Sequence, residues 1–299
     1  NRVPTRPQMI HQSSATGMQV IPTTGIAQGL QYLESISSPL LKKGVKGQLP
    51  VVVCSMGDGS VTEGEVSEAF QFAVLKKLPI IYLVQDNGWG ISVSATEARV
   101  MDACEYAAGF PGMKCIKIDG SNFEESYEAV DQAIQYVREH RSPYLIQAKV
   151  PLLGHHTSGV RREFYRSEED LALHAVNDPF PKLKKRLADT GISQEQLLQV
   201  EKEAVRLVAD DFKKACAAAE PDIDTVSAHV FAATPVTEEK GQRTPVGNHE
   251  KIMMVDAALF AIREIMEEHP EALLYGQDVG RRLGGVFREA ATLAERFGD

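Results

Sequence analysis

The sequence has few cysteines, no excess of basic residues and no long apolar run, and each shortage argues against a class of protein. Four cysteines in 299 residues, none in a C-x-x-C spacing, give no basis for a disulfide framework or a zinc site. We therefore expect free thiols and a cytoplasmic protein. With 32 Lys and Arg against 41 Asp and Glu, the net charge of −9 argues against a nucleic-acid surface. The longest apolar runs, such as 79–84, are far shorter than the roughly 20 residues of a membrane span, so we expect no membrane segment.

The composition is that of a folded protein. Hydrophobic residues make up 43% and charged residues 24% of the chain, which is close to the average of globular domains and allows a buried core. The length favours about two domains, at roughly 150 residues each. The sequence starts at Asn1 without methionine and without a signal or transit pattern, so we expect a fragment or a processed start.

Strand and helix patterns alternate between residues 49 and 150. The apolar runs typical of buried strands are 50–56, 79–85, 115–119 and 144–150. Apolar residues at helical spacing lie between them, over 66–74 and 127–137. Two consecutive βαβ units predict an α/β fold with a doubly wound parallel sheet, in which ligands bind at the carboxyl ends of the strands. We therefore expect the functional site near Gly57, Asn87, Asp119 and Gly154.

The remaining sequence divides into three parts after a first domain over 1–175. Residues 176–220 predict a helical extension, with two helices separated at Gly191, and 221–249 has the proline and threonine content of a linker. Residues 250–299 predict the start of a second α/β domain, which we expect to be incomplete. Its expected elements are a helix over 251–269, a strand over 272–276 and a loop rich in glycine and arginine over 280–285.

Two polar residues follow neighbouring predicted strands. Asp58 lies between two glycines after the first strand, and Asn87 follows the second. A carboxylate and an amide oxygen at this edge suit Mg²⁺ that is shared with the phosphates of a ligand. A Gly-Asp-Gly sequence is by itself also typical of an ordinary turn, and the strand-turn-helix context favours the site.

Two longer motifs extend this pattern. The segments GDGSVTEGEVSEAF (57–70) and LPIIYLVQDNGWGIS (78–92) resemble the thiamine diphosphate motif of the decarboxylating first component of 2-oxo acid dehydrogenase complexes, in particular its alpha subunit. The resemblance continues through GHHTSG and YRSEEDL, and LLYGQDVGRRLGGVFREAATLAERFG is similar to the start of the beta subunit of that family. It implies the thiamine diphosphate-binding fold, with the second domain being the start of a transketolase-like pyrimidine domain.

The resemblance also implies roles for individual residues. The side chains of Asp58 and Asn87 would bind Mg²⁺, with the backbone carbonyl of Trp89 beside them. The contacts to the diphosphate would come from Gly57, Gly59, Ser60, Ser14 and Thr16. His156 aligns with the active-site histidine of the family, which orients intermediates and contacts the diphosphate.

Some positions depart from the family pattern. Asp86 stands where the family usually has asparagine, and Gln85 stands where branched-chain members have a phosphate-binding arginine. Residues 157–160 replace an ordered phosphate-binding loop, and we predict no potassium site. Arg161, Arg162 and Arg166 form a basic run nearby. Two interpretations of this run stay open: a solvated turn, and a docking site for an acidic partner surface or for the diphosphate.

The resemblance implies oxidative decarboxylation of a 2-oxo acid, with transfer of the acyl group to the lipoyl group of a dihydrolipoyl acyltransferase. A branched-chain substrate is favoured, while pyruvate and 2-oxoglutarate stay open, and a homodimer is expected. Two alternatives are an acetoin dehydrogenase or another thiamine diphosphate enzyme of the transketolase group, and a non-catalytic assembly fragment. The glutamate that activates the pyrimidine lies outside this chain in the family pattern, so we expect the 299 residues alone to be inactive.

Overall fold

The computed structural model describes most of the chain. The described residues are 7–10, 14–38, 41, 48–157, 159–228, 247, 250–276, 278–280, 284–285 and 288–298. They belong to two units, Asn1–Ser193 and Gln194–Asp299, and each unit is described by itself below.

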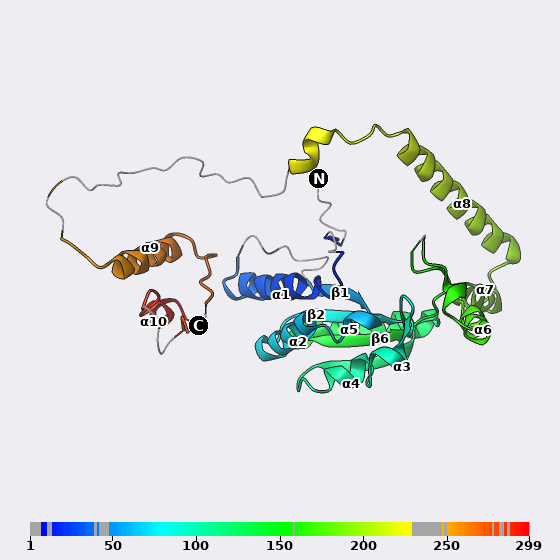
Figure 1. Cartoon of the computed structure of the whole chain (residues 1–299), viewed down its shortest axis with the longest axis horizontal. Coiled ribbons are helices and arrows are strands. Elements are labelled where there is room, and N and C mark those ends of the chain that lie inside the picture. The colour runs from blue at the N-terminus through cyan, green and yellow to red at the C-terminus, as the bar shows by residue number, and fades with distance from the viewer. Residues whose placement is uncertain are drawn as a thin grey trace. The chain divides into compact units, whose positions relative to one another are not determined.

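A four-stranded parallel sheet forms the centre of the first unit (Figure 1). In spatial order its strands are β1 (Val52–Gly57), β2 (Ile80–Asp86), β6 (Tyr144–Lys149) and β5 (Lys114–Asp119). The register pairs Gly57 with Gln85, and Lys149 with both Asp86 and Asp119, so the carboxyl ends of the strands lie along one edge. The four predicted strands and the parallel sheet are confirmed.

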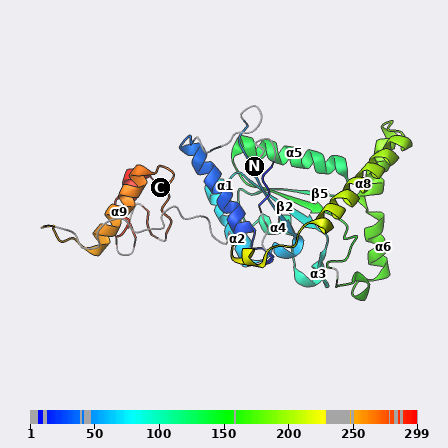
Figure 2. The ribbon, with the colours of Figure 1, turned by 90° about the horizontal axis from the view of Figure 1, so that it is seen from above.

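Helices cover both faces of this sheet, as the doubly wound prediction requires. Helices α1 (Val20–Ser35), α2 (Gly64–Lys76) and α4 (Ala103–Ala107) pack on one face, and α5 (Phe123–His140) packs on the other (Figure 2). Side chains alternate along β2, because Tyr82 belongs to the core under α2 whereas Ile81 belongs to the core under α5. Both sides of the strand are therefore buried, which explains its continuous apolar sequence.

Local chemistry fixes where α5 begins. Asn122 caps the helix, and its Oδ1 accepts hydrogen bonds from the backbone N–H groups of Glu124 and Glu125, at 3.1 and 3.4 Å. Just before it, a Cβ on Gly120 would lie 2.6 Å from Val150 Cγ1 and 2.9 Å from the Lys149 carbonyl oxygen. A glycine is required there because the turn passes directly against the end of β6.

Between β2 and β5 the chain forms short elements that the sequence patterns did not predict. A two-stranded hairpin pairs β3 (Trp89–Gly90) with β4 (Val93–Ser94), and α3 (Ala95–Ala98) follows it directly. Glu97 accepts hydrogen bonds from the backbone N–H and the hydroxyl of Ser94. These bonds cap the start of α3. Further along lie η3 (Arg162–Phe164), α6 (Glu168–Val176) and α7 (Pro179–Asp189).

The second unit contains α8 (Gln194–Ala217), η4 (Ile223–Ser227), α9 (Met254–Glu268) and α10 (Leu293–Phe297). The two helices expected on either side of Gly191 are confirmed as α7 and α8, and the helix expected over 251–269 is confirmed as α9. The strand expected over 272–276 is wrong. This segment is irregular, because no strand among the described residues of this unit lies beside it to accept its backbone hydrogen bonds.

Most of the predicted linker, over 229–246 and 248–249, and Arg281 and Arg282 of the predicted loop lie outside the described residues. None of the described helices has the length and apolar character needed to cross a membrane.

Candidate functional site

The carboxyl ends of β1 and β2 bring two of the predicted site residues together. Asp58 begins the 3-10 turn η2 (Asp58–Ser60) immediately after β1, and Asn87 follows β2. The backbone N–H of Gly88 donates a hydrogen bond to Asp58 Oδ2 at 3.2 Å. The turn that starts at Asn87 therefore lies directly against the Asp58 carboxylate, whose side chain is 3% exposed.

A second buried carboxylate, Asp86, belongs to the same cluster. Arg99 Nη2 lies 2.6 Å from Asp58 Oδ2 and 3.2 Å from Asp86 Oδ1. The other oxygen of Asp86 accepts hydrogen bonds from Gln147 Nε2 at 2.6 Å and Lys149 Nζ at 2.7 Å. The sequence patterns did not find Arg99, because it follows α3 outside every motif.

The two carboxylates differ in their acidity. Burial raises the pKa of Asp58 above its ordinary value, although the hydrogen bond from Arg99 opposes this effect. Burial also opposes ionisation of Asp86, but the hydrogen bonds from Lys149 and Gln147 hold the pKa of that carboxyl below its ordinary value. Asp86 is therefore the more firmly ionised of the two, and the charge on Asp58 depends more on the cation beside it.

The turn after β2 is joined to the loop after β6 through Trp89. The side-chain oxygen of Asn87 accepts a hydrogen bond from the Trp89 backbone N–H at 2.9 Å, which fixes the turn. The Trp89 ring packs against Tyr165 with 5.6 Å between ring centroids, and Arg166 Cζ lies 5.4 Å from the Trp89 ring centroid. This contact holds the segment after His156 near Asn87.

The predicted diphosphate residues line the start of this edge. The Ser60 hydroxyl donates a hydrogen bond to the Gly57 carbonyl at 2.7 Å. A Cβ on Gly57 would meet no atom within 4 Å, and one on Gly59 would lie 3.8 Å from Gly90 Cα, so the backbone of this loop is open to a ligand. Such a loop can present backbone N–H groups to phosphate oxygens.

The upstream segment lies beside this loop. A Cβ on Gly17 would be 3.0 Å from Glu63 Cβ, and Gln19 Nε2 donates a hydrogen bond to the Ser55 carbonyl at 3.2 Å. These contacts place Gly17, the residue after Thr16, beside the loop that starts at Gly57, and Ser14 and Thr16 are both exposed.

His155 and His156 are both exposed on the loop after β6, and His155 also bonds to the backbone of the same loop. His155 Nδ1 accepts a hydrogen bond from the Arg162 backbone N–H at 3.3 Å. Arg166 is buried, with its Nη1 donating to the Leu152 carbonyl at 3.0 Å. Within the basic run, the structure therefore separates a buried structural arginine, Arg166, from the exposed Arg161.

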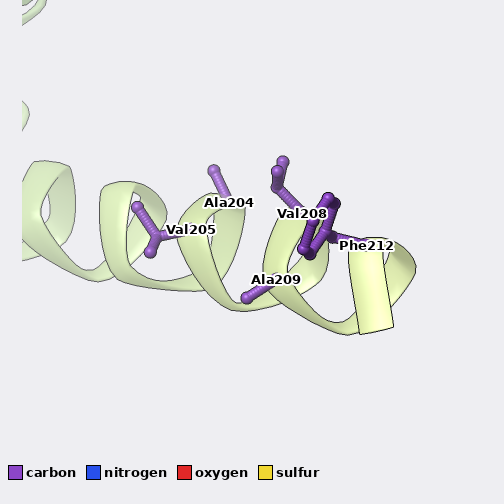
Figure 3. Close-up of a pocket in the computed structure, with 5 residues that line it drawn as sticks. All are labelled: Ala204, Val205, Val208, Ala209 and Phe212. Atoms are coloured by element: carbon purple, nitrogen blue, oxygen red, sulfur yellow. The ribbon is translucent and has the colours of Figure 1, made fainter. Parts of the chain in front are cut away.

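A hollow of about 340 Å³ opens at the same edge, next to Asn87. It is lined by Asp86, Asn87, Gly88, Asp119, Ser121, Lys149, Val150, Pro151, Leu173, His174 and Asn177. Its lining combines the charged side chains of Asp86, Asp119 and Lys149 with the apolar side chains of Val150, Pro151 and Leu173. A larger hollow of about 510 Å³ lies along α8 (Figure 3), but its lining of Ala204, Val205, Val208, Ala209 and Phe212 offers no polar side chain that could orient a substrate.

The donor set determines which cofactor this edge could hold. Among the described residues, no three His, Cys, Asp or Glu side chains cluster to form a complete metal site. The side-chain oxygens of Asp58 and Asn87 and the Trp89 carbonyl are hard ligands, which suit Mg²⁺ when phosphate oxygens complete its coordination. The residues present therefore fit a magnesium diphosphate group better than a metal ion held by protein alone.

Comparison with known proteins places the chain in a family. The family model "Dehydrogenase E1 component" matches residues 2–224. The alpha subunit of 3-methyl-2-oxobutanoate dehydrogenase from Mycobacterium tuberculosis is 29% identical over 217 residues, which cover 72% of this chain and 56% of that protein. The alpha subunit of the pyruvate dehydrogenase E1 component from Rickettsia conorii is 32% identical over 158 residues, covering 52% and 48%.

The chain thus spans about half the length of the curated relatives it matches. Among solved structures, transketolase from Campylobacter jejuni is similar at 26% identity and a TM-score of 0.38, with 44% of this chain and 20% of that chain covered. The family match covers the whole sheet and every predicted site residue, and so the chain belongs to the dehydrogenase E1 component family.

Proposed function

We propose that this protein catalyses the oxidative decarboxylation of a 2-oxo acid, with thiamine diphosphate and Mg²⁺, as the first component of a multienzyme complex. One observation carries the proposal: in a chain of the dehydrogenase E1 family, the Asp58 carboxylate lies 3.2 Å from the Gly88 N–H, so the turn at Asn87 meets the Gly57 loop. This juxtaposition supplies oxygen ligands and open backbone N–H groups at one edge of a parallel sheet.

Each part of the site has a role in this proposal. Asp58, Asn87 and the Trp89 carbonyl hold Mg²⁺, and His156 contacts the diphosphate from the loop after β6. The diphosphate is bound by Gly57, Gly59, Ser60, Ser14 and Thr16. Thiamine diphosphate, when bound, supplies the carbanion chemistry, whereas this chain binds and orients it. The structure supports the role of His156 through the Trp89–Tyr165 contact, which holds its loop near Asn87.

The proposed substrate is a branched-chain 2-oxo acid, and the proposed acceptor is the lipoyl group of a dihydrolipoyl acyltransferase. The Mycobacterium tuberculosis relative, named as a 3-methyl-2-oxobutanoate dehydrogenase subunit, supports the branched-chain substrate. Pyruvate is the second candidate, because a relative of comparable similarity belongs to pyruvate dehydrogenase. The predicted homodimer and the domain boundaries at 175, 220 and 249 remain part of the proposal.

A cytoplasmic location is also proposed. The four cysteines, Cys54, Cys104, Cys115 and Cys216, are free thiols in the structure, which is typical of a reducing compartment and supports this proposal.

The first test is a titration of the full-length protein with thiamine diphosphate, followed by Trp89 fluorescence. Trp89 is the single tryptophan of these 299 residues, and a Trp89→Phe variant gives the signal of any tryptophan elsewhere in the full-length protein, which is then subtracted. We expect saturable quenching with Mg²⁺ that disappears in EDTA and in Asp58→Asn. If neither fluorescence nor calorimetry detects magnesium-dependent binding, the proposed function is wrong.

A second assay sorts the substrates. Reduction of an artificial electron acceptor by the loaded full-length protein is measured with 3-methyl-2-oxobutanoate, pyruvate and 2-oxoglutarate. The highest kcat/KM is expected for 3-methyl-2-oxobutanoate. A higher value for pyruvate would refute the branched-chain assignment and leave the reaction class intact.

A further inference from the structure

Arg99 bridges the two carboxylates of the site with a single nitrogen. Its Nη2 lies 2.6 Å from Asp58 Oδ2 and 3.2 Å from Asp86 Oδ1. The three side chains are 9%, 3% and 1% exposed, respectively, so the cluster is shielded from water. A buried carboxylate is stable only with an opposite charge or with hydrogen-bond donors beside it. Arg99 thus belongs to the construction of the site and is not an incidental surface contact.

Asp58 depends on Arg99 more than Asp86 does. Asp86 also pairs with Lys149 Nζ at 2.7 Å and accepts a hydrogen bond from Gln147 Nε2 at 2.6 Å. In the part of the chain that the structure describes, Arg99 is the only cation paired with Asp58. The remaining donor to Asp58 Oδ2, the Gly88 N–H at 3.2 Å, is neutral. Removing Arg99 would leave Asp58 without a counter-charge, while Asp86 would keep Lys149.

The carboxylate that Arg99 neutralises is the one that the proposed function assigns to the metal. A guanidinium and a divalent cation on the same buried carboxylate would repel each other across a few ångströms, where water screens poorly. We propose that Arg99 is an internal counter-cation that competes with the divalent metal ion for Asp58. It neutralises Asp58 while the metal is absent, and the metal binds by displacing it. The inference rests on the proposed function, because it takes Asp58 as the metal ligand.

The local structure allows this displacement without unfolding. Arg99 follows the four-residue helix α3 (Ala95–Ala98), and its own N–H donates to the Ala95 carbonyl at 3.0 Å. Because Nη2 already contacts Asp86 Oδ1, the guanidinium can keep Asp86 as a partner when it leaves Asp58. A rearrangement of the side chain is therefore sufficient. The backbone of η2 and of the Asn87 turn can stay in place.

The test measures binding of Mn²⁺ alone, as an oxygen-seeking stand-in for Mg²⁺, to the full-length protein without thiamine diphosphate. Free Mn²⁺ is quantified from its electron paramagnetic resonance signal. For Arg99→Gln we expect a dissociation constant about tenfold lower than that of the unmodified protein, because the competing charge is gone. Arg99→Lys, which keeps the charge but not the fork of donors, is expected to fall between the two. Arg138→Gln is the matched control. Arg138 lies on α5, where its side chain donates a hydrogen bond to the Leu49 carbonyl, and it pairs with neither Asp58 nor Asp86.

The sign of the effect separates competition from a structural role. A residue that only holds the site in shape would weaken Mn²⁺ binding when replaced, so an equal or higher dissociation constant in Arg99→Gln overturns the inference. If Arg99→Gln does not fold, as judged by thermal unfolding, the Arg99→Lys result decides by the same rule.

Two further results keep this inference apart from the proposed function. Suppose that the unmodified protein binds Mn²⁺ in the presence of thiamine diphosphate, that Asp58→Asn abolishes this binding, and that Arg99→Gln does not lower the dissociation constant for Mn²⁺ alone. The inference is then wrong and the proposed function stands. If neither protein binds Mn²⁺ under any of these conditions, both are wrong.

Discussion

Replacing Asp86 with asparagine is expected to destabilise this protein. The two oxygens of Asp86 accept from opposite sides, with Arg99 on Oδ1 and with Lys149 and Gln147 on Oδ2. Asparagine offers one oxygen and one NH₂ group, so in either orientation a donor faces a donor.

The magnitude follows from which partners lose a bond. Arg99 keeps Asp58, and Lys149, at 61% exposure, can turn to water. Gln147 is fully buried and cannot. The substitution removes one buried charged acceptor and leaves one buried N–H donor without an acceptor. We therefore expect the free energy of unfolding to fall by about 2 kcal/mol at neutral pH.

The pH dependence gives an independent check of the same reasoning. The pKa of Asp86 is lowered in the folded protein, so its contribution is fully present above the unfolded-state pKa of about 4 and is lost as the pH falls through the folded value. The difference between Asp86→Asn and the unmodified protein should therefore be largest at pH 7 and should shrink in acid.

The assay is urea denaturation between pH 3 and pH 7, with Asp131→Asn as the control. Asp131 is an exposed carboxylate on α5, and its replacement is expected to change the stability by less than about 0.5 kcal/mol. Equal stability of Asp86→Asn and the unmodified protein at pH 7, or a difference that grows in acid, would refute the assignment of Asp86 as a firmly ionised, fully paired carboxylate.

Two further predictions test packing and thiol chemistry. Gly120→Ala should lower the free energy of unfolding by about 1–3 kcal/mol, since the new methyl group would lie 2.6 Å from Val150 Cγ1. Thermal denaturation measures this loss. Gly154→Ala is the control, because its methyl group would meet no atom within 4 Å. Iodoacetamide at pH 8 should modify exposed Cys216 well before Cys54, because burial raises the pKa of the Cys54 thiol to about 11. Peptide mapping would contradict this if both thiols reacted at the same rate in the folded protein.

The sequence by itself determined the strands of the sheet and the nearness of Asp58 to the turn at Asn87. The run from Ile80 to Val84 is apolar at every position because β2 is covered on both faces, and this property is local. Strand β1, by contrast, is buried on one face only, with Val53 exposed on the other. The positions of Asp58 and Asn87 after consecutive strands fixed their nearness, since parallel strands end on the same edge. The cap at Asn122 is also a local feature, because its side chain accepts hydrogen bonds from N–H groups two and three residues further along the chain.

The tertiary structure alone decided the strand order and the electrostatics of the site. Strand β6 lies between β2 and β5, so Lys149 and Gln147 reach Asp86, which is 63 and 61 residues away in the sequence. Arg99 meets Asp58 from the position just after a short helix that no apolar period marks. The expected strand over 272–276 failed for the same reason, because an apolar run becomes a strand only where another strand accepts its hydrogen bonds. Periodicity records which residues are buried, whereas charge pairing and strand pairing depend on partners that only the folded chain brings within reach.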